Sequence, residues 1–141
     1  MKKKICLVLG SGGSKGIAHL GVIKALVEND FEITQIAGTS AGAMMGGLYA
    51  ANLDGDKIEK EINAIDYIKL FRILVEKPSK NGLLRGKKME AFLDNLCGEK
   101  KIEDLPIKFR AVCSDLISGD KYVFDKGKLS TAIRASCAIP A

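Results

Sequence analysis

Two glycine-rich turns, each placed between a strand-like segment and a helix-like stretch, constrain the fold of this chain more than any other feature. The first turn, GSGGSKG at residues 10–16, follows the apolar run KICLVL and precedes a segment whose apolar residues recur three and four positions apart. The second turn, GTSAG at residues 38–42, follows the short strand-like segment 32–37 and precedes the small-residue segment 41–53. This order of strand, turn and helix, repeated once, is typical of a parallel sheet with helices packed on it. We therefore expect an α/β fold with a mainly parallel sheet flanked by helices.

The middle of the chain has a different character. Residues 52–101 are charged and helical in pattern, and they carry no strand signal. The spacing of apolar residues predicts an amphipathic helix over 57–74 and a second helix over 86–96. We expect residues 1–141 to form one domain, within which residues 52–101 are a helical insertion that could cap the site.

Strand character returns near the end of the chain. Residues 109–113 read as a strand, and the turn 118–120 predicts a hairpin that leads into a strand over 121–124. A last short helix is expected over 130–137, with Ser130 as its N-cap.

The second turn carries the pattern G-x-S-x-G, with Ser40 at its centre. This pattern is typical of the nucleophile elbow of serine acyl hydrolases, in which the serine lies on a strained turn between a strand and a helix. Gly38 and Gly42, which lack a Cβ, would allow the tight turn and the close approach of a substrate. The alternative interpretation is that Ser40 merely caps the helix that follows it.

The first turn is a candidate oxyanion hole, because a glycine-rich loop before a helix leaves backbone N–H groups free to bind a negatively charged oxygen. Dinucleotide binding is an alternative, but Gly16 falls one place too late for G-x-G-x-x-G, and the second strand ends in the serine turn instead of an acidic residue. Lys15 is open to two interpretations, as a ligand of an anionic group or as a solvated residue. The donors would be the backbone N–H groups of Ser11, Gly12, Gly13 and Ser14.

His19 is the single histidine of the chain, so a Ser–His–Asp triad would have to use it. It falls beside the apolar face of the first expected helix, which favours a packing role. We therefore expect the base to be a carboxylate, in a Ser–Asp dyad.

Composition narrows the class of partner. The net charge of +5 is spread along the chain, which leaves a solvated surface or a preference for anionic lipid head groups as alternatives. Aromatic residues are 6% of the chain and are not interleaved with basic ones, so no nucleic acid partner is expected.

The four cysteines show no metal-ligand spacing, and reduced, mostly buried thiols in a cytoplasmic protein are expected, without a metal. No apolar run approaches the roughly 18 residues needed to span a membrane, and peripheral contact with the inner membrane face is the alternative to a purely cytoplasmic location.

Four segments taken together resemble the patatin-like phospholipases, especially small bacterial members. They are the first turn with its flanks, residues 9–22; the serine turn, 38–42; CSDL at 113–116; and AIRASCAIP at 132–140. The resemblance covers nearly the whole chain and is loosest over the helical insertion. It implies a serine lipid acyl hydrolase that acts on a phospholipid or another fatty-acyl ester and needs no cofactor.

The resemblance also implies roles for matching residues. Ser40 would be the nucleophile and the first turn the oxyanion hole. Ser11 stands where the family has its first glycine, whereas Lys15 stands where it has Arg or Lys. Residues expected to support the loop and the elbow are Gly10, Lys15, Gly16, Gly38 and Gly42.

One part of the family pattern has no counterpart in these residues. The family's base is the aspartate of a D-G-[AG] motif downstream of the segment 132–140, and no such motif follows it here. Asp54 precedes a glycine but lies in the insertion, and Asp115 matches a different, structural position. We therefore expect the C-terminal part of the fold to be missing, either because the sequence is truncated or because an oligomer or a second chain completes the fold. We expect these 141 residues to be nearly inactive alone. The alternative is a non-catalytic regulator that binds lipid or protein.

Overall fold

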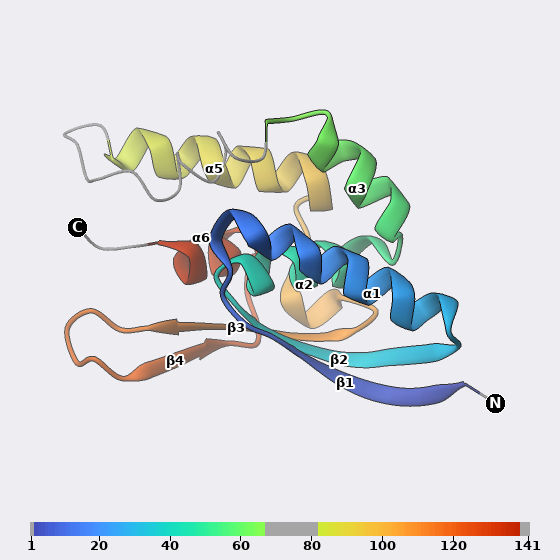
Figure 1. Ribbon diagram of the computed structural model, residues 1–141. Helices are drawn as coiled ribbons and strands as arrows, with labels where there is room; N and C mark the ends of the chain where they lie inside the picture. The colour runs from blue at the N-terminus through green and yellow to red at the C-terminus, as the bar shows by residue number, and fades with distance from the viewer. Residues whose placement is uncertain (1, 67–81, 139–141) are drawn as a thin grey trace.

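The computed structural model describes residues 2–66 and 82–138. Its centre is a four-stranded sheet in the order β1-β2-β3-β4, in which β1, β2 and β3 are parallel and β4 runs antiparallel to β3 (Figure 1). The α/β class and the mainly parallel sheet are thus confirmed. The strands are β1 (Lys3–Leu9), β2 (Phe31–Thr39), β3 (Lys108–Ser114) and β4 (Lys121–Phe124).

In the described part of the chain, the helices lie together on one face of this sheet (Figure 1). Alternation along β1 shows why, because Leu9 is buried under the helices whereas Val8 points to the other face and is 81% exposed. The described residues therefore form two layers, the sheet and the helices on one of its faces. The helices are η1 (Gly13–Ile17), α1 (Ala18–Glu28), α2 (Ala41–Asn52), α3 (Gly55–Asn63), α5 (Gly82–Cys97), η2 (Ile102–Asp104) and α6 (Leu129–Cys137).

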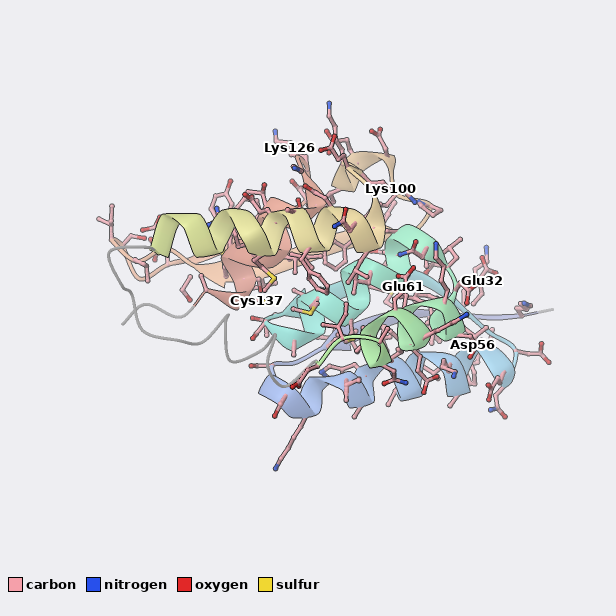
Figure 2. All side chains as sticks on the ribbon, turned by 90° about the horizontal axis from the view of Figure 1, so that it is seen from above. Glu32, Asp56, Glu61, Lys100, Lys126 and Cys137 are labelled. Atoms are coloured by element: carbon pink, nitrogen blue, oxygen red, sulfur yellow. The ribbon has the colours of Figure 1, made fainter. Side chains whose placement is uncertain are left out.

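The core is built around α2. All of its residues from Ala41 to Ala51 are buried, because a helix that is apolar on every side has no face to offer to water. Seen from the helix side, α2 lies between α1 and α5 (Figure 2). It also packs on β2 and β3. Ser40, the residue before α2, is therefore joined directly to a buried helix.

Several expected boundaries differ from those observed. The helix predicted over 57–74 ends at Asn63 in the structure, and residues 67–74 lie outside the described residues. Ser130 is not the N-cap of α6: the helix begins one residue earlier, and Ser130 lies inside it and is buried. Complete burial of Leu129 and Ile133 accounts for this register. That residues 52–101 form a cap, and that an oligomer or a second chain completes the fold, remain predictions.

Candidate active site

Ser40 lies alone between β2 and α2, at the centre of a sharp turn. Its backbone has φ 52° and ψ −122°, a combination that residues with a Cβ rarely adopt. Ser40 occupies the N-cap position of α2, but its side chain makes no capping hydrogen bond to the helix. The Ser40 hydroxyl forms no hydrogen bond to any of the described residues, and it stands at the positive end of a buried helix.

Gly42 leaves room for the backbone at the end of β1, whereas the sequence suggested room for a substrate. A Cβ on Gly42 would lie 2.2 Å from the carbonyl oxygen of Leu9, so the first turn of α2 sits directly against the end of β1. Gly38 is buried against Gly42 in turn. The space that the glycines provide is thus taken by the protein's own backbone and not by a substrate.

The glycine loop ends next to the serine turn. Its second half forms the short 3-10 helix η1, which Gly13 enters with φ 57°. A Cβ on Gly16 would lie 2.2 Å from the Cβ of Ala41, the residue after Ser40. The structure therefore brings the two glycine-rich turns together at the edge where β1 and β2 both end.

Two backbone N–H groups of this loop have no hydrogen-bond partner within the helix that follows it, and their role as oxyanion donors stays a prediction. Those of Gly13 and Ser14 lie in the first turn of η1, where N–H groups have no partner within the helix. The N–H of Lys15 is engaged, because it donates to the carbonyl of Gly12 at 3.0 Å. The side chains of Ser11 and Lys15 are exposed, and Lys15 keeps both of its expected interpretations.

His19 stabilises the start of the loop. Its Nε2 atom lies 2.8 Å from the carbonyl oxygen of Gly10, to which it donates a hydrogen bond. The half-buried ring thus ties the first turn of α1 to the end of β1. Since His19 is not bonded to Ser40, the described residues contain no Ser–His pair.

The two aspartates considered from the sequence have local structural tasks. Asp54 is the N-cap of α3 and accepts a hydrogen bond from the N–H of Lys57 at 2.9 Å. Asp115 accepts hydrogen bonds from the N–H groups of Ser118 and Ile117, which lower the pKa of its carboxyl. Among the described residues, no carboxylate is hydrogen-bonded to Ser40.

Ser136, in the last turn of α6, contacts the elbow and was not expected there. Its Oγ accepts a hydrogen bond from the N–H of Ser40 at 2.8 Å and donates one to the carbonyl of Val112 at 2.6 Å. In the sequence, Ser136 appeared only as part of the segment 132–140, and its 96-residue separation from Ser40 gave no sign of contact.

The cysteine beside Ser136 is no competing nucleophile. Cys137 is buried in the interior (Figure 2), and burial raises the pKa of its thiol to about 12. A thiol with this pKa stays protonated near neutral pH and is a poor nucleophile.

Within residues 2–66 and 82–138, no three His, Cys, Asp or Glu side chains are grouped as metal ligands. No helix in this same part of the chain is long and apolar enough to cross a membrane.

Comparison with known proteins gives the chain a family context. A family model described as patatin-like phospholipase matches residues 7–141. An uncharacterized NTE family protein of Mycobacterium bovis is 41% identical over 137 residues, which are 97% of this chain and 38% of that protein. A patatin-like phospholipase domain-containing protein of Caenorhabditis elegans is 32% identical over 140 residues, 96% of this chain and 10% of that protein. The chain thus spans well under half the length of these relatives.

Proposed function

Because the chain belongs to the patatin-like phospholipase family, we propose that the protein containing it is a lipid acyl hydrolase with Ser40 as its nucleophile. The observation that carries the proposal is the conformation of Ser40. A strained serine at a strand-to-helix turn, with a hydroxyl that does not cap the helix, has the form of a nucleophile elbow.

The reaction follows from the arrangement of the two turns. Ser40 Oγ attacks the carbonyl carbon of a fatty-acyl ester while its proton passes to a base. Loop N–H groups between Ser11 and Ser14 then stabilise the oxyanion of the tetrahedral intermediate. The alcohol leaves with a proton from the base, and water releases the fatty acid from the acyl-enzyme.

The base in this proposal is an aspartate, as the family resemblance implies. None of the described carboxylates is bonded to Ser40, so the residues described here would supply the nucleophile and the oxyanion hole. For this reason the activity is proposed for the full-length protein.

Replacing the nucleophile tests the proposal directly. We expect Ser40→Ala in the full-length protein to lower hydrolysis of p-nitrophenyl esters and of phospholipid vesicles by roughly 1,000-fold or more. Unchanged rates in a correctly folded variant would show that Ser40 is not the nucleophile.

A non-catalytic regulator that binds lipid or protein is the second candidate, favoured by the lack of a described carboxylate at Ser40. A fluorophosphonate probe separates the two, since it reacts with activated serines. Labelling of Ser40 in the wild-type protein supports the hydrolase. The regulator is supported if the probe does not label Ser40 while the protein still binds vesicles of anionic phospholipid.

A further inference from the structure

We propose that Ser136 is a positioning residue that holds the backbone of Ser40 in its reactive conformation. The inference rests on the proposed function, because it assigns to Ser136 a role in the reactivity of Ser40. Ser136 is not a catalytic residue in this proposal. Its hydroxyl is engaged by backbone groups on both sides and does not take part in bond making or breaking.

The hydroxyl of Ser136 stands where the sheet comes apart. Thr39 and Val112 are the last paired residues of β2 and β3, and the chain turns away from β3 at Ser40. The Ser136 hydroxyl accepts from the N–H of Ser40 and donates to the carbonyl of Val112. One side chain from α6 thus bridges the opening between the two strands.

This bridge matters because the backbone conformation of Ser40 is strained and needs support from neighbouring groups. A residue with a Cβ at φ 52° and ψ −122° keeps that conformation only when its surroundings impose it. The carbonyl of Ser40 is fixed by the N–H of Met44 at 3.0 Å. The N–H of Ser40 is fixed by Ser136, so the two bonds restrain the peptide groups on either side of the Ser40 Cα.

The neighbouring contacts indicate that removal of the Ser136 hydroxyl would chiefly break the hydrogen bond to the N–H of Ser40. The carbonyl of Val112 also accepts a hydrogen bond from Thr39 Oγ1 at 3.1 Å. Without the Ser136 hydroxyl, Val112 would keep a partner, whereas the N–H of Ser40 would lose the one seen in the structure. Removing this hydroxyl should therefore affect the elbow more than the sheet.

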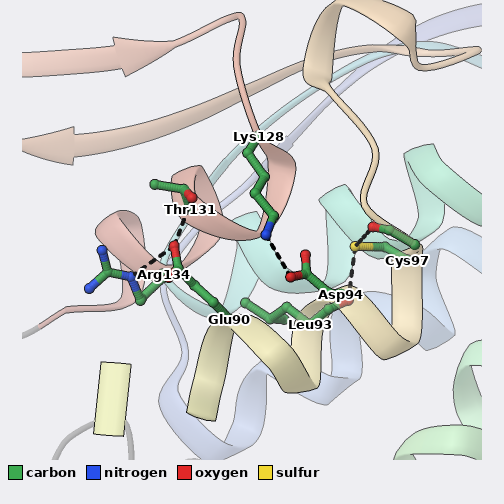
Figure 3. Close-up of polar contacts among 8 residues, drawn as sticks. Glu90, Leu93, Asp94, Cys97, Lys128, Thr131 and Arg134 are labelled. Carbon is green, nitrogen blue, oxygen red and sulfur yellow. Dashed lines mark hydrogen bonds and ion pairs between the residues drawn. The ribbon is translucent and has the colours of Figure 1, made fainter. Parts of the chain in front are cut away.

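α6 is itself held firmly enough to act as a support. Figure 3 shows two carboxylates of α5 facing its other side. Glu90 accepts a hydrogen bond from Thr131 Oγ1 at 2.7 Å and lies 3.4 Å from Arg134 Nε. Asp94 pairs with Lys128 Nζ at 2.7 Å. Ser136 therefore projects from a helix that is fixed to α5 on one side and to the elbow on the other.

The test compares Ser136→Ala with wild type in the full-length protein. We expect the rate of fluorophosphonate labelling at Ser40, and kcat for ester hydrolysis, to fall by about 10-fold to 100-fold, as for a modest misplacement of a reacting group. KM should change little, because Ser136 does not contact the substrate in this proposal. Ser136→Thr, which keeps the hydroxyl, should restore most of the rate.

Ser130→Ala is the matched control. It removes a hydroxyl from the same helix, buried and away from the elbow, and should leave the labelling rate unchanged. If Ser136→Ala labels as fast as wild type, or if Ser130→Ala slows labelling to the same extent, the proposal is overturned.

A second readout does not depend on activity. Hydrogen exchange of the Ser40 amide, followed by NMR, should be faster in Ser136→Ala than in wild type and unchanged in Ser130→Ala. If wild type is not labelled by the probe, the proposed function fails, and the amide measurement still decides whether Ser136 holds Ser40. Equal exchange of the Ser40 amide in wild type and Ser136→Ala overturns the inference regardless of the labelling result.

Discussion

At the level of single residues, the strain at Ser40 has a measurable consequence. Its backbone conformation of φ 52° and ψ −122° costs about 1–3 kcal/mol for a residue with a Cβ. Glycine avoids that cost but loses about 0.5–1 kcal/mol through the greater freedom of the unfolded chain. The two effects leave a net gain for glycine.

We therefore predict that Ser40→Gly is more stable than Ser40→Ala by about 1 kcal/mol. Both variants lack the nucleophile, so the comparison isolates the backbone. Urea denaturation of the two variants, both prepared in the full-length protein, measures the difference in their free energy of unfolding. Equal midpoints would mean that Ser40 relaxes to an unstrained conformation in solution.

The sequence was sufficient to identify Ser40 and the loop as candidates, but not the residues that support them. The pattern G-x-S-x-G can be checked against its own flanks, because a nucleophile elbow requires a strand before it and a helix after it. The contacts of Ser136 and His19 have no such signal. Both side chains bond to backbone groups that only the folded chain brings near them. A single hydroxyl or ring leaves no repeating pattern in the sequence from which such a contact could be predicted.

At the level of elements, we expect the contact between α5 and α6 to depend on pH, because it contains the carboxyl group of Asp94. Burial acts to raise the pKa of Asp94, but Lys128 and the nearby Ser130 hydroxyl outweigh it and lower the pKa below its ordinary value. The Ser130 hydroxyl does so without a well-oriented hydrogen bond to Asp94. A carboxyl whose pKa is lower in the folded than in the unfolded protein stabilises the fold above the unfolded pKa, about 3.9. That contribution is lost as the pH falls through the lower, folded value.

Asp94→Asn should therefore lower the free energy of unfolding at pH 7 and should lower it less as the pH falls below about 4. Urea denaturation of wild type and variant between pH 7 and pH 3 measures this convergence. Asp120→Asn, which changes an exposed aspartate at the hairpin turn, is the control for net charge. A difference between wild type and Asp94→Asn that stays constant across this range would contradict the role given to the charged carboxylate.

At the level of the whole molecule, the order of elements was predictable and the layer arrangement was not. The two strand-like segments followed by glycine-rich turns and helices indicated parallel strands, and β1 and β2 are parallel. Which helices cover which face depends on packing across the sheet. In β1, Lys4, Cys6 and Val8 lie on the face that carries no helix within the described part of the chain. The sequence does not reveal this alternation, because both faces of the strand carry apolar residues.

The four thiols report on this arrangement because they range from exposed to fully buried. Cys6 is exposed on β1, and Cys113 is half-buried with a pKa that burial raises. Burial raises the pKa of Cys97 to about 11 and that of Cys137 to about 12. At pH 8 about one in 1,000 of the Cys97 thiols and one in 10,000 of the Cys137 thiols would be thiolate, which is the reactive form.

Iodoacetamide should therefore modify Cys6 first in the native protein, Cys113 more slowly, and Cys97 and Cys137 only after unfolding in urea. Mass spectrometry of the peptides at successive times measures the order, and Cys6→Ser should remove the fast phase alone. Cys137 is the informative site, because it follows Ser136 in the last turn of α6. Modification of Cys137 in the native protein as fast as that of Cys6 would mean that this turn leaves the core readily, and a turn that does so could not hold the Ser40 backbone.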